Sequence, residues 1–134
     1  MELMQISLLG SVPSSKNSKR IFRAKGGKTI LANSKTVQKY LDEYEYQWCD
    51  EENIKKFKEM IKDKKPPYKV GFYFIRATRH KFDYINALQL PQDLMVKHGW
   101  LEDDNCDEII PVILGYEYDS KKVGGLSITV IDND

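Results

Sequence analysis

The stretch Tyr68-Lys-Val-Gly-Phe-Tyr-Phe-Ile-Arg-Ala-Thr78, with the segment 83–97 that follows it, decides the fold of this 134-residue chain. Residues 68–78 are rich in aromatic and β-branched side chains, which predicts a strand buried on at least one side. Residues 83–97 predict a helix, with Asp83 near its N-cap and Gly99 just past its end. Pro91 within that helix predicts a kink or a restart.

Upstream of this unit, the chain predicts a strand, a hairpin and a long helical region. Residues 2–12 alternate loosely, as a strand does, and Pro13 ends them. The runs 19–24 and 28–32 flank a Lys-Gly-Gly turn, which predicts a basic β-hairpin.

The helical region is predicted to begin at an N-cap at Asn33 or Ser34 and to run to about Lys64. It should break near residues 46–48 and begin again at Asp50 or Glu51.

Downstream, residues 108–119 and 126–132 predict two more strands, joined by a turn that contains Gly124 and Gly125. The resulting order of elements implies an α+β fold: one domain over residues 1–134, with a mixed β-sheet and helices packed on it. No apolar run approaches the ~18 residues that would span a membrane, and the N-terminus lacks the basic region of a secretory signal. Cys49 and Cys106 form no CxxC pair, so we expect two unpaired thiols in a cytoplasmic protein.

The net charge of +1 hides an asymmetry. Residues 1–80 carry 17 Lys and Arg against 9 Asp and Glu, whereas residues 81–134 carry 4 against 11. Residues 13–39 contain eight basic residues and no acidic one. Such a segment can neutralise phosphates and release their counterions, and an acidic second half suits a metal site that acts on a phosphodiester. The alternative is solubility charge that happens to be unevenly spread.

Two stretches carry the candidate chemistry: Lys81-Phe-Asp-Tyr-Ile-Asn86, which opens the helix, and Gly99-Trp-Leu-Glu-Asp-Asp-Asn105, which follows it. If Asp83 and Asp104 meet, they form an oxygen-rich site of the kind that Mg²⁺ occupies. The helix holds them apart along its axis. Either a neighbouring loop folds Asp104 back toward Asp83, or a partner subunit supplies it.

The stretch 81–105 resembles the motif of RusA-like Holliday-junction resolvases, which runs Asp-x-Asp-Asn-x-x-Lys, then an Asp, then Gly-x-x-x-Asp-Asp. The match needs no gap, and it places Asp83, Asn86, Asp93, Gly99 and the pair Asp103-Asp104 on motif positions. The segment 13–20 is similar to the family's Pro-Ser-x-Asn basic segment. The resemblance implies an α+β homodimer that binds four-way or other branched DNA and cuts it with Mg²⁺, or with Mn²⁺, in replication, recombination, repair or phage-DNA processing.

The resemblance assigns the candidate roles. Catalytic candidates are Asp83, Asp104, Asp103, Asn86 and Lys81, of which Asp83, Asp104 and Asp103 are the metal ligands. DNA-binding candidates are Lys16, Asn17, Lys19, Arg20, Arg23, Lys25 and Lys28.

The chain departs from the motif at two positions. Ile85 stands where the family has its second catalytic Asp, and Gln89 stands where it has a catalytic Lys. Lys81 is a candidate replacement for the missing cation, and Glu102, Asp103, Asp107 and Asn86 are candidate replacement ligands. These departures keep open a catalytically inactive protein that binds branched DNA with the same fold. A second rival, an adaptor or inhibitor with this fold, has no positive sign in the sequence.

Other site types find no support. The acidic run 103–107 lacks the Gly and Glu of an EF-hand loop, and His80 and His98 have no zinc-ligand spacing. No serine nucleophile or Walker-type loop is recognisable. Trp100 is predicted to lie in the core, and the alternative is a residue that stacks on a DNA junction.

Overall fold

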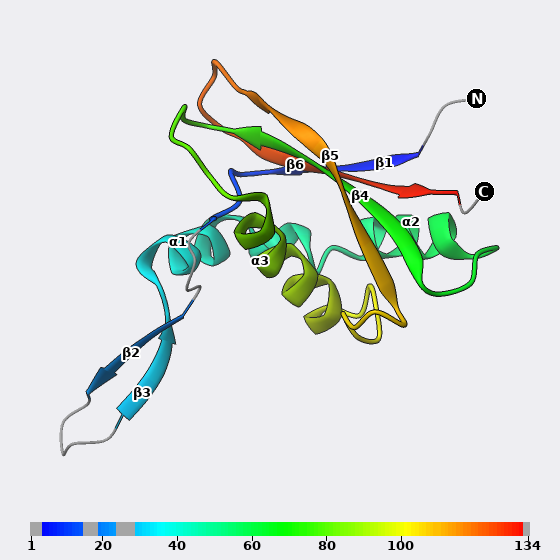
Figure 1. Ribbon diagram of the computed structural model, residues 1–134, viewed down its shortest axis with the longest axis horizontal. Helices are drawn as coiled ribbons and strands as arrows, with labels where there is room; N and C mark the ends of the chain where they lie inside the picture. Colours follow the sequence, from blue (N-terminus) through cyan, green and yellow to red (C-terminus); the bar gives the residue numbers. More distant parts are fainter. Residues whose placement is uncertain (1–3, 15–18, 24–28, 133–134) are drawn as a thin grey trace.

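The computed structural model describes residues 4–14, 19–23 and 29–132, with residues 19–23 and 29–33 as backbone only. Its centre is a four-stranded sheet in the order β1-β6-β4-β5 (Figure 1). The strands are β1 (Gln5–Leu9), β4 (Tyr68–Arg76), β5 (Ile109–Tyr118) and β6 (Gly125–Ile131). β6 is antiparallel to β1 and to β4, whereas β5 is parallel to β4. The predicted α+β domain with a mixed sheet is therefore confirmed.

Three helices cover one face of the sheet: α1 (Lys35–Tyr44), α2 (Glu51–Ile61) and α3 (Tyr84–Lys97). A short 3₁₀ turn, η1 (Glu45–Gln47), separates α1 from α2, as the break near residues 46–48 predicted. Each helix begins at a side-chain cap, because Ser34, Asp50 and Asp83 accept hydrogen bonds from backbone N–H groups of the first turn. These caps satisfy donors that have no partner within the helix.

The core lies between the helices and alternate residues of the strands. Val70, Phe72 and Phe74 of β4 are fully buried, and they pack in one cluster with buried side chains of all three helices. Trp48 and Trp100 are also fully buried, which confirms Trp100 as a core residue and rules out its stacking on DNA. Burial of each large apolar side chain contributes about 1.5–3 kcal/mol.

The helix α3 runs without interruption through Pro91, so the chain does not restart there. Pro91 has no N–H to donate to the preceding turn. Gln92 bonds to that turn through its side chain, because its Nε2 donates to the carbonyl of Leu88 at 3.0 Å. Burial of Leu90, Pro91 and Leu94 against the core stabilises the helix where the proline removes a backbone bond.

Two consecutive strands, β5 and β6, lie on opposite sides of β4 and do not pair. The connection therefore crosses the end of β4, where Asp119 donates its backbone N–H to the carbonyl of Arg76 at 2.8 Å. The Asp119 carboxylate accepts backbone N–H bonds from Lys121, Val123 and Gly124, which lower the pKa of this carboxyl. The parallel pairing of β4 with β5 brings the carboxyl ends of these two strands together, beside the start of α3.

The basic segment forms a separate two-stranded sheet. β2 (Lys19–Arg23) pairs antiparallel with β3 (Thr29–Asn33), as predicted for a hairpin. Across the described ranges, no helix is both long enough and apolar enough to cross a bilayer.

Candidate functional site

The N-terminal end of α3 holds Asp83 in a defined position. Its Oδ1 accepts the backbone N–H of Ile85 at 3.0 Å, which is the geometry of a helix cap. The carboxylate is exposed, and its second oxygen remains available to a ligand. Asn86 lies half-buried in the same first turn, and Lys81 is exposed two residues before Asp83.

The C-terminal end of α3 leads into the second acidic stretch. Gly99 takes a left-handed conformation (φ 80°) that ends the helix, and the buried Trp100 and Leu101 anchor the loop that follows. Asp103 organises this loop, because its carboxylate accepts the N–H of Asp104 at 2.7 Å and the Asn105 side-chain amide at 3.1 Å. Asp104 is exposed at the surface of the loop.

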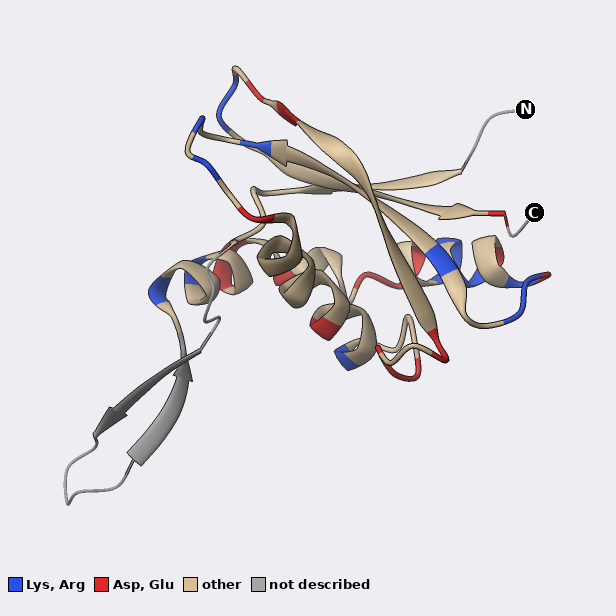
Figure 2. Cartoon of the chain, in the orientation of Figure 1, with Lys and Arg blue, Asp and Glu red and all other residues tan. Residues whose placement is uncertain are grey.

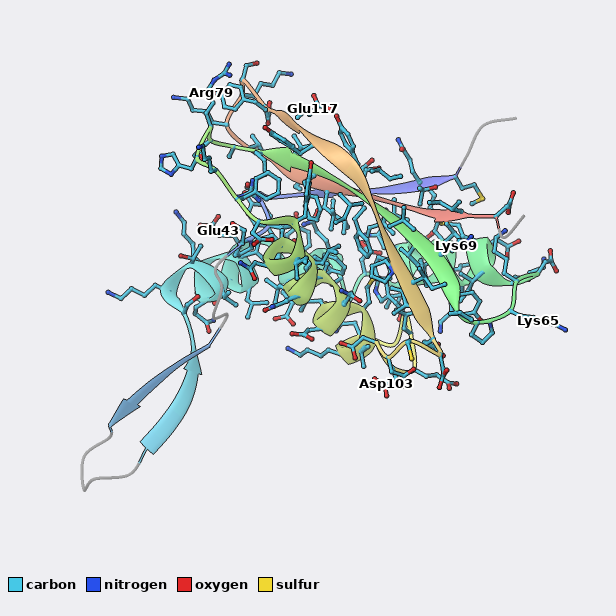
Figure 3. All side chains as sticks on the ribbon, in the orientation of Figure 1. Glu43, Lys65, Lys69, Arg79, Asp103 and Glu117 are labelled. Atoms are coloured by element: carbon cyan, nitrogen blue, oxygen red, sulfur yellow. The ribbon has the colours of Figure 1, made fainter. Side chains whose placement is uncertain are left out.

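One chain does not bring these carboxylates together. α3 has 14 residues, which separate its two ends by about 21 Å at 1.5 Å per residue. The loop after α3 leads into β5 and does not fold back, and Figure 3 shows Asp103 at the opposite end of the molecule from Arg79, four residues before Asp83. Within the part of the chain that the structure describes, no three His, Cys, Asp or Glu side chains are placed to hold one metal ion. A site that joins Asp83 to Asp103 and Asp104 therefore needs a second subunit.

The two departures from the motif lie on the exposed face of α3. Ile85 is 70% exposed, and Gln89 is exposed one turn farther along the helix. Ile85 therefore lies outside the core. It is the most exposed large apolar side chain among the described residues. In a monomer, an isoleucine in this position buries little of its apolar surface. It contributes to binding when another molecule covers it.

A pocket opens beside Asp83, at the carboxyl ends of β4 and β5. Its volume is about 350 Å³, and residues 78–82, Tyr84, Tyr116 and Tyr118 line it. In open α/β sheets, ligands bind at this end of parallel strands. Of these lining residues, Lys81 was predicted from the sequence as a site residue, whereas the tyrosines were not. Tyr116 and Tyr118 are two residues apart on β5 and therefore lie on the same face of this strand. This pattern indicates a site only when the pairing of β5 with β4 is known.

Charge is distributed unevenly around the two ends of α3. Figure 2 shows Lys and Arg where β4 leads into residues 79–81 and in the turn before β6, and Asp and Glu along the loop after α3. Arg76, at the end of β4, has its guanidinium 4.4 Å from the centre of the Phe82 ring. Burial lowers the pKa of Arg76. Its Nε is buried with no hydrogen-bond partner among the described residues.

The side chains of all seven predicted DNA-binding residues lie outside the part of the chain that the structure describes. Four of them lie outside the described residues: Lys16, Asn17, Lys25 and Lys28. The other three lie on β2, whose backbone alone is described: Lys19, Arg20 and Arg23. Cys49 and Cys106 are both unpaired and exposed, which agrees with the prediction of two unpaired thiols.

No family model and no curated protein matches the chain.

Proposed function

We propose that this protein is a homodimeric endonuclease of branched DNA that uses Mg²⁺ held between its two subunits. Each site would combine Asp83 of one protomer with Asp103 and Asp104 of its partner. The single observation that carries the proposal is the placement of carboxylates at both ends of one surface helix, about 21 Å apart by the rise of an α-helix. When bound to such carboxylates, Mg²⁺ activates a water and stabilises the leaving oxygen of a phosphodiester.

A two-fold axis through the middle of α3 would satisfy this geometry. Two α3 helices that pack antiparallel bring the N-terminal end of each beside the C-terminal loop of the other, and the axis generates two equivalent sites. The exposed side chain of Ile85 favours this face as the contact. A four-way junction is itself two-fold symmetric, so two sites related by an axis fit its two strands of like polarity.

The basic hairpin supports the choice of nucleic acid as the partner. The strand β2 carries three of the eight basic residues of the segment 13–39, and this segment has no acidic residue. Backbone phosphates are the partners that such a segment recognises without regard to base sequence.

A second candidate function is a DNA-binding protein that does not cut. Ile85 at the position of a ligand favours it, because an isoleucine cannot bind a metal, and so does Gln89 at the position of a cation. In that case Asp83 would serve as a helix cap only.

A mixed-dimer experiment separates these possibilities. The variants Asp83→Asn and Asp104→Asn should each bind a four-way junction at least as tightly as the parent but fail to cut it with Mg²⁺ or Mn²⁺. Mixed and refolded in equal amounts, they should recover cutting, because each heterodimer contains one site with both aspartates. Half of the dimers are then mixed, so about a quarter of the parent's sites are intact.

Three results would contradict the proposal in different ways. If the parent binds junctions but never cuts them, the inactive binder is correct. If the variants are inactive and the mixture is also inactive, each site lies within one chain.

The interface itself is checked by two variants of exposed apolar residues. Ile85→Lys should yield monomers in light scattering, whereas Ile110→Lys on β5 should leave the dimer intact. The reverse pattern would place the interface on the sheet.

A further inference from the structure

The pocket beside Asp83 has a rigid aromatic side. The rings of Phe82 and Tyr84 lie 5.2 Å apart and nearly perpendicular, and Phe82 packs edge-on to Tyr116 at 5.1 Å. Phe74, which is fully buried in β4, contacts Phe82 and Tyr84 from behind at 6.0 and 6.1 Å. The cluster is thus held by the core, while Tyr116, its outermost ring, is 55% exposed.

The other side of the pocket is cationic. Arg79 lies with its guanidinium 4.2 Å from the centre of the Tyr118 ring, which holds it at the pocket. His80 and Lys81 are exposed next to it. Along the described ranges, none of these three side chains forms an ion pair with a carboxylate of the chain.

Among the described residues, the neighbouring carboxylates of Asp83 and Asp119 form no ion pair with this cationic side. Asp83 bonds to the first turn of α3, and Asp119 bonds to backbone N–H groups of its own turn. Because the Asp83 carboxylate already lies at the N-terminal end of α3, the backbone N–H groups of this helix end are not what would attract an anionic ligand here.

An exposed aromatic ring next to unpaired cations is the combination that binds single-stranded nucleic acid, since bases stack on the ring and phosphates lie against the cations. The pocket volume of about 350 Å³ suits one small ligand and not a duplex. We propose that this pocket takes one unpaired nucleotide, with its base on Tyr116 and its phosphate against Arg79. The inference rests on the proposed function and adds to it the part of the branched substrate that the protein recognises.

The test measures binding to two DNAs of equal length, one a continuous duplex and the other with one unpaired 2-aminopurine at a branch. Tyr116→Ala should weaken binding to the branched DNA by roughly tenfold, the loss expected for one stacked base. It should leave duplex binding unchanged, and Tyr116→Phe, which keeps the ring, should bind as the parent does. The 2-aminopurine fluorescence should be quenched by the parent and not by Tyr116→Ala.

Matched controls come from exposed side chains outside the pocket. Tyr46→Ala removes a ring that is 61% exposed but lies outside the pocket, and it should have no effect. Arg79→Ala should weaken binding to the branched DNA more than Lys65→Ala, because Lys65 lies at the opposite end of the molecule from Arg79 (Figure 3).

The results distinguish the pocket from the nuclease. If the parent cuts junctions and Tyr116→Ala binds and cuts equally well, the pocket inference is wrong and the proposed function stands. If the parent binds the unpaired nucleotide through Tyr116 but never cuts, the pocket stands and the nuclease is wrong. A parent that binds neither DNA overturns both.

Discussion

Trp100 donates its indole N–H to the backbone carbonyl of Trp48 at 2.7 Å, and the centres of the two rings lie 5.4 Å apart. Trp48 in turn donates to the hydroxyl of Tyr40 at 3.1 Å. Burial raises the pKa of Tyr40 to about 12, so this hydroxyl stays protonated at neutral pH. These bonds join the acidic loop after α3 to the connection between α1 and α2. The position of Asp103 and Asp104 is therefore set by the core.

The first prediction follows from this contact. Trp100→Phe keeps most of the apolar volume but leaves the Trp48 carbonyl buried without its donor, which should cost about 1–3 kcal/mol of unfolding free energy. Trp100→Ala also opens a cavity and should cost about 3–5 kcal/mol. Urea unfolding measures both. Trp100→Phe with the stability of the parent would show that the hydrogen bond contributes nothing.

The second prediction compares two glycines with similar backbone conformations. Gly124 (φ 77°) has no room for a Cβ, which would lie 2.7 Å from the Cβ of Ser11, whereas Gly99 (φ 80°) has open space there. Gly99→Ala should cost only the left-handed strain, about 1 kcal/mol. Gly124→Ala adds the clash with Ser11 and should cost clearly more in thermal unfolding. Equal costs would mean that the turn before β6 shifts freely.

The third prediction concerns acid stability. The hydrogen bond from Lys97 to Glu45, at 2.7 Å, lowers the pKa of this carboxyl, partial burial opposes the shift, and the contact with His98 lowers it further. A pKa depressed on folding means that the contribution is complete above the ordinary value of 4.5 and is lost as the pH falls through the depressed pKa.

Glu45→Gln should therefore flatten the loss of stability with falling pH below the ordinary glutamate range. Lys97 is 60% exposed, so solvent screening limits the effect to about 0.5–1 kcal/mol. Chemical unfolding at several pH values measures it. Glu59→Gln, which removes an ion pair with Lys62 that is exposed on both sides, serves as the control and should leave the pH profile unchanged.

The fourth prediction restores a missing acid. Ile85→Asp places a carboxylate on an exposed position in the first turn of α3. It should change the stability of the fold by no more than about 0.5 kcal/mol, as exposed substitutions do. Without metal, the added charge should weaken the dimer as Ile85→Lys does. With Mg²⁺ or Mn²⁺, the ion neutralises this charge and gains a ligand beside Asp83, so the metal affinity in calorimetry should rise and the dimer should be restored. Strong destabilisation would show that Ile85 is covered within the subunit, and unchanged metal affinity would show that no ion binds at this end of α3.

The fifth prediction tests the basic hairpin. Binding to junction DNA should weaken steeply with salt, with a slope of about −0.9 in log K against log salt for each phosphate neutralised. Replacing both Lys19 and Arg20 by alanine should reduce that slope and lower affinity equally for different base sequences. A flat salt dependence of the parent would remove nucleic acid as the partner.

The sequence by itself determined the order and type of the elements. The aromatic and β-branched run 68–78, the polar caps Ser34, Asp50 and Asp83, and the glycine after α3 are local signals, and local backbone preferences act over a few residues. The sequence also identified both acidic ends of α3. What it left open was whether they meet, because that depends on how the chain continues in space beyond the helix.

Only the tertiary structure decided three matters. The insertion of β4 between β5 and β6 brought Tyr116 and Tyr118 beside residues 78–82, a contact between segments that no local pattern encodes. The packing of α3 left Ile85 exposed and buried Trp100. The length of α3 kept Asp83 away from Asp104 within one chain, because a helix advances by a fixed rise for each residue and a loop anchored by buried side chains cannot fold back along it.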